Sequence, residues 1–101
     1  MKILKGILRE SKQYYFDAKK KIQKMLSRLP KGSVKERKIN GRRYYYLQER
    51  KGAKVIQKYL GKDKPEKLLK QIKERRLLRG ELKKVNEALR MLKRAEGKKS
   101  G

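Results

Sequence analysis

Residues 33–61 read SVKERKI (33–39), Asn40-Gly41, RRYYYLQE (42–49), a glycine at position 52, and KVIQKYLG (54–61). The three runs are rich in β-branched and aromatic residues, a composition typical of strands. Asn-Gly between two such runs is the strongest short hairpin signal, because both central residues of a type I′ turn adopt positive φ. The stretch therefore predicts a three-stranded antiparallel β-meander over residues 33–60, with turns at Asn40-Gly41 and Gly52.

The segment before the meander has a heptad pattern typical of a long helix that packs against another helix. The pattern predicts a helix over residues 4–29, which Pro30 and Gly32 end. Ser11 and Ala18 place small and partly polar side chains on the face that contacts the partner helix, which is called the seam. A close helix partner therefore fits there better than a wide core. The seam consists of two interleaved series: Leu8, Tyr15, Ile22 and Leu29 in one, and Leu4, Ser11, Ala18 and Met25 in the other.

The segment after the meander begins with Asp63-Lys64-Pro65-Glu66, the arrangement of a helix start. An Asp cap followed three residues later by Glu satisfies exposed backbone amides, and proline fits in a first helical turn. A second helix is therefore predicted over residues 64–95, with Gly80 marking a bend or a close crossing. Its apolar stripe consists of Leu68, Ile72, Leu78, Leu82, Val85, Leu89 and Leu92.

Two long helices around a meander predict an α+β fold whose helices pack as an antiparallel coiled-coil-like pair. Residues 1–97 form a single domain in this prediction, and residues 98–101 form a basic tail. The helix pair forms either within one chain or between two chains, and the sequence does not choose between them. A homodimer through the helices would present two meanders symmetrically to adjacent stretches of duplex.

The composition predicts a polyanionic partner. The 101 residues include 34 Lys and Arg against 10 Asp and Glu, which gives a formal net charge of +24. The excess is not confined to a tail, because residues 1–30, 31–64 and 65–101 carry +7, +9 and +8. Such a net charge exceeds what solubility requires, and it attracts nucleic acid. It also destabilises the compact state by self-repulsion unless anions bind or salt screens the charges.

Residue types that the chain lacks exclude several function classes. The sequence has no Cys and no His, so it offers no disulfide, no thiolate metal site and no histidine base. The acids are scattered singly, which leaves the tyrosines without the proton acceptor or metal carboxylates that a DNA-cleaving enzyme needs. We therefore expect no enzyme activity, no metal and no cofactor.

The apolar residues predict no association with a membrane. No apolar run approaches the ~18 residues that a membrane span requires. The start, Met1 to Leu8, is too short and too interrupted for a signal-peptide core. Attachment to an anionic membrane surface would need a free helix face of bulky apolar groups, whereas both stripes are used in helix packing. A cytoplasmic setting is expected, with the protein associated with the nucleoid or with ribosomes.

Recognition of a partner is expected in the meander. Strand alternation places Tyr45 with Arg43 on one face of the middle strand, and Tyr44 and Tyr46 with Arg42 on the other. One face must pack on the helices. As an alternative to recognition, two of the three tyrosines are core residues. The free face presents aromatic rings between cationic groups. The candidate nucleic-acid-binding residues are Lys35, Arg37, Lys38, Arg42, Arg43, Tyr44, Tyr46, Gln48, Arg50, Lys51, Lys54 and Lys58.

Residues 30–65 resemble small, mostly uncharacterised basic proteins of archaea and their mobile elements. The resemblance is carried by Leu29-Pro30-x-Gly32-Ser33-Val34, Asn40-Gly41, Tyr44-Tyr45-Tyr46-Leu47-Gln48, Gly52, Lys54-Val55 and Lys58-Tyr59-Leu60-Gly61-Lys62. The layout is also similar to the three-stranded DNA-binding modules at the front of phage-type integrases and some transposases, whose sheets enter a major groove. This chain departs from the integrase type because long helices flank its sheet and no catalytic domain is present, so recombination is not implied. The resemblance implies a nucleic-acid-facing surface that includes Arg42, Arg43, Tyr44, Tyr46, Lys54 and Lys58.

The resulting hypothesis is that the chain binds nucleic acid without catalysis and that double-stranded DNA is its preferred ligand. Three-stranded ribbons of this kind lie in a major groove, where Arg and Gln reach base edges while Lys and Tyr hold phosphates. Stacking of unpaired bases on the rings is the alternative mode. A ribosome-associated or other structural RNA-binding protein is the second hypothesis, because charge spread through every segment also suits burial in folded RNA.

Overall fold

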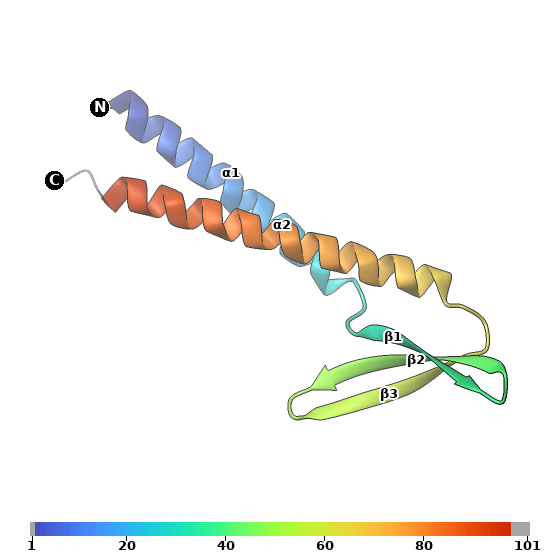
Figure 1. The fold of residues 1–101 in the computed structure, drawn as a ribbon. Helices are drawn as coiled ribbons and strands as arrows, with labels where there is room; N and C mark the ends of the chain where they lie inside the picture. The colour runs from blue at the N-terminus through green and yellow to red at the C-terminus, as the bar shows by residue number, and fades with distance from the viewer. Residues whose placement is uncertain (1, 98–101) are drawn as a thin grey trace. The chain divides into compact units, whose positions relative to one another are not determined.

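The structure, a computed structural model, describes residues 2–97. The elements follow in the order α1 (Lys2–Ser27), β1 (Ser33–Ile39), β2 (Arg42–Lys51), β3 (Lys54–Gly61) and α2 (Glu66–Gly97) (Figure 1). The predicted α+β fold is confirmed: a three-stranded antiparallel meander lies between two helices in the sequence, and the helices are in contact. The predicted basic tail, residues 98–101, lies outside the described residues.

The first helix is displaced by two residues from its predicted bounds. It begins at Lys2 and ends at Ser27, not at Leu29. The early end has a physical cause, because Pro30 disfavours helical φ and ψ in the residue before it. Arg28 N–H donates to the Met25 carbonyl oxygen at 3.2 Å, a short-range bond that closes the last turn.

The second helix is also displaced by two residues, and its interior is continuous. It begins at Glu66, because the Pro65 carbonyl oxygen accepts the first helical bond, from Leu69 N–H at 2.9 Å. It ends at Gly97. A side chain added at Gly80 would meet nothing within 4 Å, so the alternative that this glycine permits a close helix crossing is wrong.

Contacts divide the chain into two compact units that share α2. A helical unit comprises Met1–Arg28 and Leu77–Gly101, and a sheet unit comprises Leu29–Arg76. In the helical unit, α1 and the second half of α2 run alongside each other in opposite directions (Figure 1). Lys12 Nζ and Glu96 Oε2 form an ion pair across the helices at 3.1 Å. The predicted antiparallel pair therefore forms within one chain, and a homodimer stays a prediction.

The seam of α1 follows the predicted heptad in its middle and departs from it at both ends. Leu4 and Met25 are exposed, with exposed fractions of 54% and 39%, and Leu26 is half-buried in place of Met25. A straight α-helix rotates by about 20° per heptad relative to a strict seven-residue series, which moves the distant members off the contact line. The predicted positions that are half-buried in the helix are Leu8, Ser11, Tyr15, Ala18 and Ile22.

Each unit has a small hydrophobic core with one buried residue. Val85 of α2 and Tyr45 of β2, each with 8% of its surface exposed, are the buried residues of the described chain. The other members of the predicted α2 stripe are half-buried. No helix within residues 2–97 has the length and apolar character needed to cross a membrane.

The sheet has the strand order β1-β2-β3, and both pairings are antiparallel. The predicted type I′ hairpin between β1 and β2 is confirmed, because Asn40 has φ 51° and Gly41 has φ 78°. In the second turn Gly52 has φ 62°, which fits a type II′ turn with glycine at its first central position. The register shifts between Tyr45 and Tyr46, where β3 carries an extra residue. Such a bulge bends the strand and increases its twist.

Glycine at position 32 is required by the close approach of the chain to β2. Gly32 has φ 108°, and a Cβ atom there would lie 2.6 Å from the backbone oxygen of Gln48 and 3.1 Å from a side-chain carbon of Leu47. A larger residue would push the chain away from β2 just before β1 begins. Gly32 was predicted to end the first helix, and in the structure it also positions the first strand.

Candidate nucleic-acid interface

The two faces of the meander carry different side chains. Strand alternation and the observed register place every second residue on the same face. One face, the Tyr44 face, consists of Ser33, Lys35, Arg37 and Ile39 of β1, Arg42, Tyr44, Tyr46, Gln48 and Arg50 of β2, and Val55, Gln57 and Tyr59 of β3. The opposite Tyr45 face consists of Val34, Glu36, Lys38, Arg43, Tyr45, Leu47, Glu49, Lys51, Lys54, Ile56 and Lys58.

The Tyr45 face is the covered one. Tyr45 is buried, and its neighbours Val34 and Leu47 are half-buried. The sheet unit also contains the first turns of α2, where Leu68 and Ile72 are half-buried. These are the less exposed apolar groups of the sheet unit. Of the three consecutive tyrosines, Tyr45 is buried, and Tyr44 and Tyr46 are half-buried on the other face.

Charge is distributed unequally between the faces. Among the described strand residues, both carboxylates, Glu36 and Glu49, lie on the Tyr45 face, and the Tyr44 face carries none. Arg43 Nε lies 3.1 Å from Glu36 Oε1, so part of the positive charge on the Tyr45 face is paired. The Tyr44 face carries four cationic side chains and no strand carboxylate, whereas the Tyr45 face carries five cationic side chains and two carboxylates.

The structure separates the twelve predicted site residues into two groups. Seven lie on the Tyr44 face, namely Lys35, Arg37, Arg42, Tyr44, Tyr46, Gln48 and Arg50. The other five lie on the Tyr45 face, namely Lys38, Arg43, Lys51, Lys54 and Lys58. Adjacent residues in the sequence, such as Arg42 and Arg43, thus point in opposite directions. Their roles in binding stay predictions, and the separation allows them to be tested one face at a time.

An aromatic hollow lies on the Tyr44 face. The rings of Tyr46 and Tyr59 have centroids 5.4 Å apart, and those of Tyr44 and Tyr59 are 6.3 Å apart. Together with Ile39 they line an open cavity of about 330 Å³. Tyr59 and Ile39 are 52% and 47% exposed, and neither was among the predicted site residues. The alternation of β3 was the available signal for Tyr59, but its register against β2 was needed to place it beside Tyr46.

A hydrogen-bonded group spans all three strands beside this hollow. The Arg37 guanidinium carbon lies 5.2 Å from the centre of the Tyr46 ring, in a cation–π arrangement. Arg37 Nη2 donates to Gln57 Oε1 at 3.0 Å, and Gln57 Nε2 donates to Gln48 Oε1 at 3.2 Å. We call these four residues the arginine cluster. It holds an exposed guanidinium in one position, because a ring supports it from one side and an amide oxygen accepts from it.

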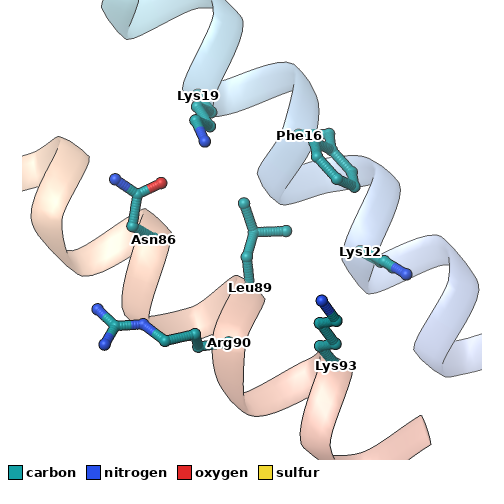
Figure 2. Close-up of a pocket in the computed structure, with 7 residues that line it drawn as sticks. All are labelled: Lys12, Phe16, Lys19, Asn86, Leu89, Arg90 and Lys93. Carbon is teal, nitrogen blue, oxygen red and sulfur yellow. The ribbon is translucent and has the colours of Figure 1, made fainter.

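A second basic hollow lies between the helices of the helical unit. Figure 2 shows Leu89 pointing between α1 and α2, with cationic side chains around it from both helices. The cavity measures about 300 Å³. Lys12 forms an ion pair with Glu96. Within residues 2–97, Lys19, Arg90 and Lys93 form no ion pair with a carboxylate. Lys12, Phe16, Lys19, Asn86, Leu89, Arg90 and Lys93 line it. Such a group of cations can neutralise phosphates.

Comparison with known families shows a match over most of the chain. The family described as a domain of unknown function, DUF6788, matches residues 7–70. The chain belongs to the DUF6788 family. The DUF6788 match includes most of α1, the whole meander with all twelve predicted site residues, and the start of α2. No curated protein and no solved structure matches the chain, so the likeness to integrase modules and to proteins of archaeal mobile elements stays a prediction for this DUF6788 protein.

Proposed function

We propose that this protein binds nucleic acid without catalysis, and that double-stranded DNA is its ligand. The Tyr44 face lies in the major groove and supplies base or shape preference. Lysines and arginines of the helices and strand edges neutralise phosphates and release counterions, which provides most of the affinity. Because counterion release depends on salt, binding weakens steeply as salt rises.

The observation that carries this proposal is the composition of the Tyr44 face. It combines four cations, three tyrosines and two glutamines, while both strand carboxylates lie on the opposite face. Arginine and glutamine are the side chains that pair with purine edges in the major groove, and lysine and tyrosine contact phosphates. A face used only for solubility would mix both signs of charge, and this one does not.

The dimensions of the sheet agree with a groove. Neighbouring strands lie about 4.8 Å apart, so three strands span about 10 Å, which is close to the ~12 Å width of the major groove of B-DNA. The longest strand, β2, has 10 residues. Sheets of two or three strands are known as readers of DNA grooves. A sheet of this width can therefore present the Tyr44 face to base edges and its rim to phosphates.

A second candidate is binding of unpaired RNA or DNA bases. The observation that favours it is the aromatic hollow, in which Tyr59 is half exposed and two further rings lie beside it. Bases stack on exposed rings with about 1–3 kcal/mol each. A ribosome-associated or other structural RNA-binding role would use this mode together with the charge of the helices.

Titration of the protein against matched duplex DNA, duplex RNA and single strands tests the proposal. Binding is followed by fluorescence anisotropy over a range of salt concentrations. We expect a preference for duplex DNA that persists at physiological salt. A preference for single strands would support stacking on the hollow instead. Equal and steeply salt-dependent binding to all ligands would mean that net charge alone acts, and the proposed groove recognition would be wrong.

Two neighbouring arginines provide a matched pair for the same assay. Arg42→Ala removes a cation from the Tyr44 face, and Arg43→Ala removes one that is paired with Glu36 on the Tyr45 face. Both variants have the same net charge, so long-range attraction falls equally. We expect Arg42→Ala to weaken binding more and to reduce the salt slope by about 1. Equal losses from the two variants would remove the Tyr44 face from the interface.

A further inference from the structure

The chemistry of the arginine cluster fixes the orientation of its two amide groups. Arg37 can only donate hydrogen bonds, so the atom of Gln57 that faces it must be the oxygen Oε1. The amide nitrogen of Gln57 then faces Gln48 and donates to its Oε1 at 3.2 Å. If the Gln57 amide were reversed, its N–H groups would face the N–H groups of Arg37, and no hydrogen bond could form. The network therefore admits one arrangement, in which each donor meets an acceptor.

The outward edge of the cluster consequently presents donors. The oxygens of Gln57 and Gln48 both accept hydrogen bonds inside the cluster. The donors that remain for a ligand are the other N–H groups of Arg37, the second N–H of Gln57 and the amide nitrogen of Gln48, while each amide oxygen keeps one of its two lone pairs. Because the Tyr46 ring and Gln57 already hold the guanidinium in place, little side-chain entropy is lost when the edge meets a ligand.

A donor edge discriminates between bases in the major groove. Guanine presents two acceptors there, N7 and O6, and arginine bonds both. Adenine presents an acceptor beside a donor, and a glutamine reads it with its oxygen and nitrogen together. In this cluster the oxygen of Gln48 is directed to Gln57 and not outward. The edge therefore offers a donor to each of the two guanine acceptors, whereas the N6 donor of adenine would find only the second lone pair of an amide oxygen that is already engaged.

We propose that Arg37 reads a guanine in the major groove of duplex DNA, with Gln57 and Tyr46 as positioning residues. The inference rests on the proposed function and deepens it, since it names a base and the side chain that recognises it. Neither residue beside Arg37 needs to touch the DNA. Their effect is to keep the guanidinium fork in the plane and direction in which two parallel N–H groups can bond one base.

A base analogue tests this inference without changing base pairing or charge. Duplexes preferred by the full-length chain are first selected from a randomised pool. Each guanine is then replaced in turn by 7-deazaguanine, which lacks the N7 acceptor. We expect one replacement to weaken binding by about tenfold, the scale of one lost base-edge contact. In Arg37→Lys the same replacement should have a smaller effect, because lysine can still donate to a guanine acceptor but lacks the fork that bonds N7 and O6 together.

Two further variants separate reading from positioning and from charge. Gln57→Met removes the amide oxygen that accepts from Arg37 and should reduce the effect of 7-deazaguanine while leaving the urea midpoint of unfolding unchanged. Arg50→Lys is the control, because Arg50 lies on the same face outside the cluster and should leave the guanine preference intact. If Arg50→Lys abolishes the preference and Arg37→Lys does not, Arg37 is not the reading residue.

The outcomes distinguish this inference from the proposed function. If the wild-type chain binds no duplex DNA, both are wrong. If it binds duplex DNA through Arg42 but 7-deazaguanine changes nothing at any position, the proposed function stands and the guanine reading is overturned. An effect of 7-deazaguanine that is as large in Arg37→Lys as in the wild type also overturns it, because another side chain then reads the base.

Discussion

Neighbouring tyrosines of β2 lie in opposite environments, although one residue separates them in the sequence. Tyr45 is buried on a face that also holds both strand glutamates, whereas Tyr44 lines an open hollow on a face with no strand carboxylate. The pleat of one strand thus divides the same residue type between stability and candidate recognition. The difference teaches that a run of like residues in a strand must be interpreted one face at a time.

The largest expected effect is on stability, and it separates these two tyrosines. Tyr45→Ala should destabilise the protein by about 3–5 kcal/mol, the usual cost of truncating a large buried aromatic residue. Tyr44→Ala makes the same chemical change on the open face and should change the free energy of unfolding by about 1 kcal/mol or less. Urea denaturation followed by circular dichroism at high salt measures both. Equal losses would contradict the assignment of the covered face.

A smaller effect is expected from the glycine that sets β1 beside β2. Gly32→Ala places a Cβ against the Gln48 backbone oxygen at a positive φ, and should cost about 1–3 kcal/mol through strain. Gly80→Ala is the matched control, because α2 has open space there and alanine should stabilise the helix by about 1 kcal/mol. The same urea assay applies. A neutral Gly32→Ala would show that the chain relaxes at this point and that the faces do not depend on it.

The smallest effect concerns the ion pair on the covered face. A double-mutant cycle of Arg43→Ala and Glu36→Ala should give a coupling free energy of about 0.2–1 kcal/mol, because both side chains are substantially exposed. The coupling should fall as salt rises. A cycle of Arg42→Ala with Glu36→Ala is the control and should give no coupling. Coupling between Arg42 and Glu36 would mean that the two arginines do not lie on opposite faces.

The main elements of the fold were predictable from local signals. Asn40-Gly41 fixed the first turn because few residues accept positive φ, and the apolar stripe around Val85 located the contact face of α2. The predicted bounds of both helices differed from the observed ones by two residues. Pro30 disfavours helical backbone angles in the residue before it, so α1 ends early. The Pro65 carbonyl oxygen accepts the first helical hydrogen bond of α2, so that helix begins at Glu66. Met25 was assigned to the seam in place of Leu26, because a strict heptad ignores the 3.6-residue turn.

The candidate site was predictable in composition and not in arrangement. The sequence indicated a basic, aromatic meander, and alternation separated Arg42 from Arg43. It did not indicate which face is covered, because that depends on packing between distant segments. The bridge from Arg37 to Gln57 joins strands that are not neighbours in the sheet, and it depends on the registers of both pairings. A local pattern contains no information on such a contact.

The order β1-β2-β3 leaves two open sheet edges, and this arrangement has a consequence for solubility. An uncovered strand offers unpaired backbone groups on which another copy of the chain can add a strand. Here the outer strands carry Lys35, Arg37 and Lys38 on one side and Lys54 and Lys58 on the other. Their mutual repulsion opposes edge-to-edge stacking. These charges thus oppose aggregation of the free protein, and under the proposed function a bound nucleic acid that neutralises them must itself keep the exposed edges apart.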